Sequence, residues 1–145
     1  MTNLHPVDMP RRPITRDWTI DLDTTYQRRV DGGDVMFWLP PRTVYASVYA
    51  TADVEAEEAI TRMLAGRPGT PVQTFDRAEP GLAGHAYLLP EGEGKGRYWG
   101  LNTWTAARGS VACVTFYFDQ LDDLHWALET WRSVRCESCE RGYLN

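Results

Sequence analysis

The chain lacks long apolar runs, and none of its segments approaches the roughly 20 residues that a membrane-spanning helix needs. Its first sixteen residues are polar and contain three prolines, so they do not resemble the apolar core of a signal peptide. From these two absences we expect a cytoplasmic protein that does not use a membrane as a partner.

Cysteine and positive charge are also scarce. Three cysteines among 145 residues are an odd number and too few for a secreted disulfide scaffold. The 15 basic and 20 acidic residues leave a formal net charge of -5, which argues against nucleic acid as a partner. A group of arginines does occur near the N-terminus, and we interpret it as a solvated arm and strand face because no RNA-binding signature accompanies it: Arg11, Arg12, Arg16, Arg28 and Arg29.

Recognised catalytic signatures are missing as well, including G-x-S-x-G and H-E-x-x-H. Gly94-Lys95-Gly96 lacks the spacing of a phosphate-binding loop and is expected to be a hairpin tip. We expect His85 to be a strand residue bonded to a neighbour, and His125 to lie at the edge of a helix's apolar face. The sequence therefore predicts no catalytic residue, no cofactor and no metal ligand.

Cys136 and Cys139 form the one motif with chemical meaning, because thiols two residues apart can bind a metal or cycle between redox states. The pair follows the C-terminus of a predicted helix, where the negative end of the helix dipole opposes thiolate formation. A structural zinc would need two further ligands, and no second closely spaced pair is present. An exposed polar tail and a metal or redox site are the two alternatives.

Alternating strands that lead into amphipathic helices are the clearest positive signal. Residues 35–39 and 43–50 precede a predicted helix near 53–66 that Asp53 would cap, and residues 98–104 and 111–118 precede one near 119–135. This order predicts an α+β fold, a mainly antiparallel sheet of about six to eight strands with two principal helices packed against it. We expect a flexible arm over 1–15, a single domain over 16–135 and a polar tail over 136–145.

The periodicity also assigns faces. The last helix has one apolar face, made of Leu121, Leu124, Ala127, Leu128, Trp131 and Val134, which places Trp126 on the opposite, polar side. In the strand over 43–51, Val44, Ala46, Val48 and Ala50 form the face predicted to lie under a helix. Tyr45, Ser47 and Tyr49 then face solvent, a groove or a partner.

Aromatic residues are plentiful, with six Trp and seven Tyr. Those expected to be exposed are the candidate binding residues, because Trp and Tyr are enriched at interfaces and in ligand grooves: Tyr45, Tyr49, Trp99, Trp104 and Trp126. The leading hypothesis is a non-enzymatic binding or adaptor domain, immunity- or chaperone-like, that holds a protein partner or a second copy of itself. The alternative is a small-molecule-binding protein or enzyme whose pocket is lined by the first four of these residues.

Three stretches carry a resemblance: residues 18–21 (WTID), 35–40 (VMFWLP) with 42–44 (RTV), and 116–119 (FYFD) continuing through 131–132 (WR). Over 16–135 the chain resembles a group of small uncharacterised bacterial proteins. Its element order is also similar to the α/β sandwich of the photosystem II extrinsic protein PsbP and of a Ran-binding nuclear import factor. The resemblance implies a PsbP-like sandwich and, since these stretches are packing patterns, no activity and no site.

Overall fold

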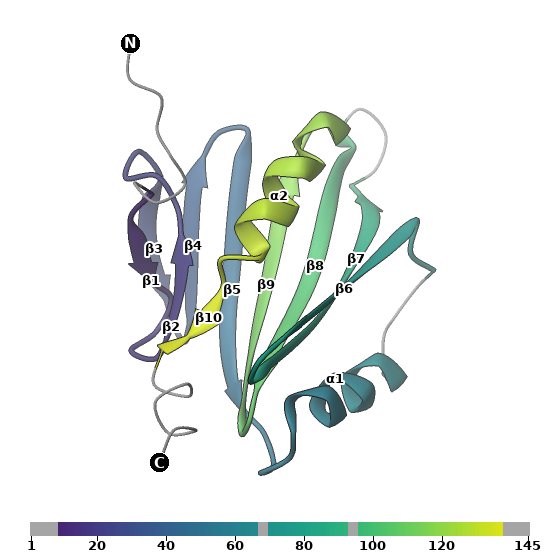
Figure 1. The fold of residues 1–145 in the computed structure, drawn as a ribbon. Coiled ribbons are helices and arrows are strands. Elements are labelled where there is room, and N and C mark those ends of the chain that lie inside the picture. The colour runs from purple at the N-terminus through teal and green to yellow at the C-terminus, as the bar shows by residue number, and fades with distance from the viewer. Residues whose placement is uncertain (1–8, 67–69, 93–95, 138–145) are drawn as a thin grey trace.

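The structure, a computed structural model, describes residues 9–66, 70–92 and 96–137. Within these ranges the main element is a seven-stranded sheet whose neighbouring strands all pair antiparallel. Its strands are β3 (Gln27–Asp31), β4 (Asp34–Leu39), β5 (Arg42–Ala50), β6 (Gln73–Glu79), β7 (Leu82–Glu91), β8 (Tyr98–Ala107) and β9 (Ser110–Phe118). The predicted α+β fold with a mainly antiparallel sheet is confirmed (Figure 1).

Two meanders make up this large sheet, whose strand order is β3-β4-β5-β9-β8-β7-β6. The first runs from β3 to β5 and begins with a tight hairpin, in which Gly32 adopts a φ of 66° that a residue with a side chain would rarely take. The second runs from β6 to β9. They join where β5 pairs with β9, with Ala46 opposite Val114.

One face of the large sheet is covered along its length. Figure 1 shows α2 (Leu124–Trp131) in front of β8 and β9, and a small sheet beside it over the first meander. The small sheet contains β1 (Arg11–Pro13), β2 (Trp18–Asp21) and β10 (Arg135–Cys136), in the order β1-β2-β10. Val44 and Ala46 are buried on this side, within the main core that also includes residues of β2 and α2.

The small sheet includes parts of both segments expected to lie outside the domain. Arg11–Pro13 belongs to the predicted arm over 1–15, yet it pairs with β2, with Arg12 opposite Ile20. Cys136 belongs to the predicted tail over 136–145, yet it is fully buried and pairs with Trp18. Strand pairing therefore extends the ordered domain at both ends beyond the expected boundaries.

The predicted helix near 119–135 corresponds to a short 3-10 helix, η3 (Leu121–Asp123), followed by α2. Ala127 and Trp131 are buried as expected, but the placement of Trp126 on the polar side is wrong. Its ring packs edge-on against Phe116 at 5.7 Å and stacks on Tyr26 at 6.2 Å. The reason is that the segment between β2 and β3 gives α2 a second packed side.

The helix α1 (Ala56–Ala65) lies against the opposite face of the large sheet and covers only one end of it. Ala56, Ala59 and Ile60 pack there against Ala83, Ala106 and Val111. The Asp53 side chain does not cap this helix, since its carboxylate is 2.6 Å from the guanidinium of Arg108. None of the helices within the described ranges is long and apolar enough to cross a bilayer.

Candidate functional site

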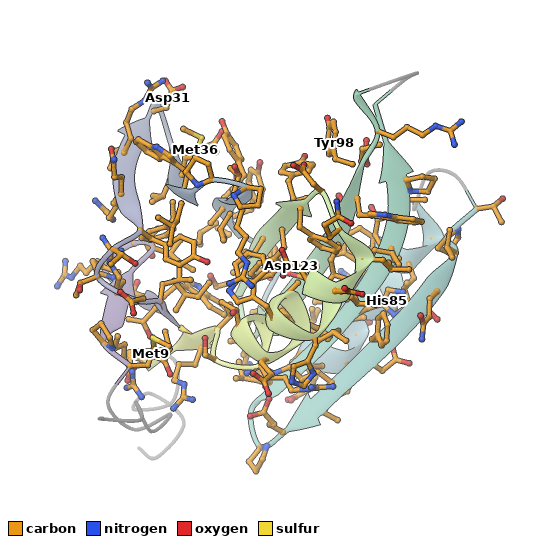
Figure 2. All side chains as sticks on the ribbon, turned by 90° about the horizontal axis from the view of Figure 1, so that it is seen from above. Met9, Asp31, Met36, His85, Tyr98 and Asp123 are labelled. Carbon is orange, nitrogen blue, oxygen red and sulfur yellow. The ribbon has the colours of Figure 1, made fainter. Side chains whose placement is uncertain are left out.

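The face of the large sheet opposite α2 remains partly uncovered beyond α1, and we call this area the open face. Strand alternation and register identify its members, each half-buried or exposed: Asp34, Met36, Trp38, Thr43, Tyr45, Ser47, Tyr49, Tyr98, Asn102, Trp104, Cys113, Thr115 and Tyr117. Figure 2 shows Met36 and Tyr98 on the side of the sheet away from Asp123 at the start of α2. The open face therefore combines aromatic rings with hydroxyl and amide groups.

Two aromatic pairs lie on β7, β8 and β9 within this area. The rings of Tyr98 and Tyr117 meet edge to face with centroids 5.7 Å apart, and those of Tyr87 and Trp104 do so at 5.5 Å. Asn102 lies between the two pairs along β8. Edge-to-face contacts orient the rings. Tyr98, Tyr117 and Trp104 are half-buried, whereas Tyr87 is buried beneath the open face.

Tyr45 is held in place by a carboxylate on the neighbouring strand. Its hydroxyl donates to Asp34 Oδ2 at 3.1 Å, and the Ser47 hydroxyl donates to Asp34 Oδ1 at 2.5 Å. The hydrogen bond to Asp34 raises the pKa of Tyr45 above its ordinary value, because it stabilises the protonated phenol. The ring is therefore presented in a fixed orientation, which reduces the entropy lost on binding.

A pocket of about 300 Å³ opens at the end of the open face farthest from α1. It lies where β5 and β8 begin and β9 ends, and it is lined by Pro41, Thr43, Tyr98, Tyr117, Phe118 and Asp119. Its walls combine two phenol rings, a threonine hydroxyl and a carboxylate. None of the four residues expected to line a ligand pocket contributes to this one.

Gly100 shapes the sheet next to this pocket. A Cβ at residue 100 would lie 3.1 Å from Glu91 Cγ and 3.4 Å from Tyr117 Cε1, so the missing side chain lets both groups approach the strand. The pKa of Tyr117 is raised, first by burial and then by the negative charge of Glu91. Negative potential is therefore concentrated beside the Tyr117 ring.

The five candidate binding residues fall on both sides of the sheet. Tyr45, Tyr49 and Trp104 lie on the open face, and Tyr49 is 56% exposed. Trp99 and Trp126 are also half-buried, but they pack against the main core on the covered side and do not contribute to the open face. The cause for Trp99 is its position opposite buried Phe118, on the covered side of β8.

Three further aromatic residues of the open face are not among the five candidate binding residues. Trp38, Tyr98 and Tyr117 belong to the open face, and strand alternation contains the signal that finds them. In β8, Leu101 and Thr103 are buried, and Trp99 points to the same side because it is an even number of residues away from both. Tyr98 is an odd number of residues away and therefore lies on the other side.

Cys113 on the open face and His85 on the neighbouring β7 do not form a nucleophilic dyad. His85 is buried and its Nδ1 lies 2.8 Å from Asp76 Oδ1, which confirms the expected strand histidine bonded to a neighbour. Register places Trp104 between His85 and Cys113. Burial raises the pKa of the Cys113 thiol to about 11, so the nucleophilic thiolate is suppressed at neutral pH.

His125 and Cys136, the other titratable candidates in the described residues, each have a bonding partner. His125 is exposed, and its Nε2 lies 2.9 Å from Glu129 Oε1. Cys136 is disulfide-bonded, while Cys139 and Gly94-Lys95 lie outside the described residues. Over the described ranges, no group of three or more His, Cys, Asp or Glu side chains is arranged to hold a metal ion.

Two of the five arginines near the N-terminus attach the small sheet to the rest of the molecule. The Arg12 guanidinium donates to the carbonyl oxygens of Asp23 at 3.1 Å and Tyr26 at 2.6 Å, and it lies 5.1 Å from the Phe37 ring centroid. Arg28 donates to the Pro13 carbonyl at 3.1 Å. Arg12 and Arg28 thus make internal contacts, which differs from the solvated arm and strand face expected from the sequence.

Comparison with known proteins gives information on the fold alone. No family model and no curated protein matches the chain. A crystal structure from Bacteroides thetaiotaomicron VPI-5482, solved at 1.50 Å, is similar with a TM-score of 0.70 and 12% sequence identity. The similarity covers 89% of this chain and 49% of that one, so the chain spans about half the length of the structure it matches.

Proposed function

We propose that the protein is a non-enzymatic binding or adaptor domain that holds a polypeptide partner on the open face. The observation behind this proposal is that α1 covers only one end of this face, which leaves a contiguous set of half-exposed aromatic and hydroxyl side chains. Contiguous exposed apolar areas on soluble proteins usually mark interaction sites, and Tyr and Trp supply much of the energy there.

The extent of the open face favours a polypeptide over a small ligand. Its side chains come from β4, β5, β9 and β8, which are neighbours in the sheet. At the usual spacing between strands these four span about 14 Å, a width that suits a protein surface. A second copy of the chain would be one such partner, and an immunity- or chaperone-like role would be another use of the same surface.

The cytoplasm is the compartment we propose, and Cys136 offers a direct check. Disulfides are rare in the cytoplasm, whereas Cys136 is disulfide-bonded. Thiol trapping in the native host should find Cys136 mainly reduced if the protein works there. Full oxidation in growing cells would contradict this compartment and leave the proposed binding surface intact.

The test of the binding surface replaces Tyr45 and Tyr49 together by Ser. The matched control is Val30→Ser on β3, because Val30 is 57% exposed and lies on the other side of the sheet, opposite Val35. We expect the double variant to lose a captured partner, or the homodimer in sedimentation, while circular dichroism stays unchanged. The control should keep both, and isothermal titration with the purified partner then measures the loss of affinity.

Retention of every partner by the folded double variant would contradict the proposal. It would favour a second candidate function, a small-molecule-binding protein or an enzyme that uses the pocket. That alternative is supported by the pocket's volume of about 300 Å³ and by the polar residues Thr43, Tyr117 and Asp119 in its lining. Crystals soaked with a small-molecule fragment library would show whether ligands occupy this pocket.

A further inference from the structure

We propose that the pocket lined by Tyr98, Tyr117 and Asp119 receives an arginine or lysine side chain of the partner. This inference rests on the proposed function and specifies the chemistry of the partner at one end of the open face. A cationic side chain would lie over the end of β9 and the start of β8, with its charge facing the carboxylate of Asp119.

The aromatic walls supply the first part of the recognition. The Tyr98 and Tyr117 rings meet at an interplanar angle of 72°, so one ring presents its edge to the face of the other. Both residues are half-buried, and both line the pocket. A guanidinium or ammonium group within about 6 Å of such a ring is attracted by its quadrupole, more strongly where water is excluded.

Two carboxylates supply the second part. Asp119 lines the pocket and is exposed, and Glu91 reaches the Tyr117 ring across Gly100. The ion pairs within the described part of the chain include neither carboxylate. Their charge is therefore available to an incoming cation.

Nearby cations of the chain do not fill this role. Arg42 follows Pro41 in the sequence, but its Nη2 lies 2.8 Å from Asp123 Oδ1 and its guanidinium stacks at 4.6 Å on Trp126. Those contacts lie on the covered side of the sheet. Arg97 precedes Tyr98, is exposed, and is not among the residues that line the pocket.

The lining chemistry selects among ligands. An anion would meet Asp119, and the negative charge of Glu91 beside Tyr117, without a compensating cation among the lining residues, which costs free energy. A hard metal ion would need several oxygen ligands, and half of the wall is aromatic carbon and proline. A flat or elongated organic cation matches both the aromatic and the acidic part of the wall. Its apolar stem packs on the rings, while its charge faces the carboxylate of Asp119.

The experiment is a titration of the full chain followed by NMR, with Nα-acetyl-arginine amide and Nα-acetyl-lysine amide as probes. We expect amide shifts at Thr43, Tyr98, Tyr117 and Asp119. Nα-acetyl-citrulline amide, which has the shape of arginine without its charge, should bind about fivefold more weakly or worse. Asp119→Asn should lower the affinity for the arginine probe by about fivefold. The matched control Asp122→Asn, an exposed carboxylate outside the lining, should not.

Equal binding of the citrulline probe, or unchanged arginine affinity in Asp119→Asn, would overturn the inference. Putrescine is a third probe, and binding of this free diamine at least tenfold tighter than either amide would assign the pocket to a small amine instead of a side chain. The titration needs no partner, so its failure is separate from that of the proposed function. The double variant at Tyr45 and Tyr49 could lose the captured partner while the unmodified chain fails to bind the arginine probe. That combination would refute only the pocket's role.

Discussion

Gly84 is the residue whose missing side chain allows α2 to approach the large sheet closely. A Cβ at this position would lie 2.9 Å from Trp131 Cζ2 and 3.0 Å from the Trp104 carbonyl oxygen. Trp131 is fully buried and its Nε1 donates to Thr105 Oγ1 at 2.9 Å, so its ring has little freedom to move away. Close packing makes an added methyl group at such a site costly.

Gly84→Ala should therefore lower the free energy of unfolding by about 1–3 kcal/mol, measured by urea denaturation. Gly33→Ala is the matched control, because a Cβ at residue 33 would meet no atom within 4 Å. A fall in stability of similar size in both variants would contradict the steric explanation.

Cys113 provides a prediction of pH dependence. Burial raises the pKa of its thiol from 9.0 to about 11, so the folded protein retains a proton that the unfolded chain loses first. The stabilising contribution of this group is complete below about pH 9 and is lost as the pH rises toward 11. At pH 8.5 we expect iodoacetamide to modify Cys113 much more slowly in the folded protein than in urea, as measured by peptide mass spectrometry. Equal rates in the two states would show that the thiol is not protected.

At the scale of elements, Trp126 contributes to the packing of α2, although the apolar face predicted for this helix does not include it. The Trp126 ring contacts Tyr26 and Phe116, and the Arg42 guanidinium covers it. Trp126→Ala should reduce stability by about 3 kcal/mol in chemical denaturation, because it leaves a cavity between α2 and β9. His125→Ala, an exposed neighbour on the same helix, should change it by less than about 1 kcal/mol. Similar small effects for both would restore the original assignment of Trp126 to the polar side.

Local periodicity accounts for the elements that the sequence predicts well. Alternation in residues 35–50 and 98–118 and the helical stripes identify the four central strands and both helices, because each pattern is complete within a short segment. The small sheet was missed because β2 pairs with both β1 and β10, and β10 comes from the other end of the domain. No local period encodes such a pairing, and β10 has only two residues.

The sequence predicted part of the candidate site, as it predicted part of the fold. The parity of Tyr45 and Tyr49 follows from their own strand, so their side of the sheet is correct. Trp126 was misplaced because the residues that bury it lie on other segments. The pocket could not be foreseen, since its lining combines the starts of β5 and β8 with the end of β9. Only the order of strands in the sheet brings these three points together.

At the scale of the whole molecule, the sheet edges bear on how a partner can bind. The large sheet ends at β3 on one side and β6 on the other. The edge strand β3 contains Arg28, Arg29 and Asp31, and the edge strand β6 contains Asp76 and Glu79. Charged side chains on edge strands disfavour pairing with another chain. Association through the open face is therefore better supported than strand addition at an edge.

The junction of the two meanders at β5 and β9 also has a kinetic consequence. Each meander closes by short hairpins, whereas residues 42–50 and 110–118 are far apart in the chain and must meet across a long loop. The entropy of that closure is lost before the pairing provides its stabilisation, so the contact order of the whole domain is high. We expect refolding on the scale of milliseconds to seconds in stopped-flow fluorescence, slower than that of helical proteins of this size. Val44→Ala and Val114→Ala, both at the junction, should accelerate unfolding more than they slow folding if the meanders form first and dock last.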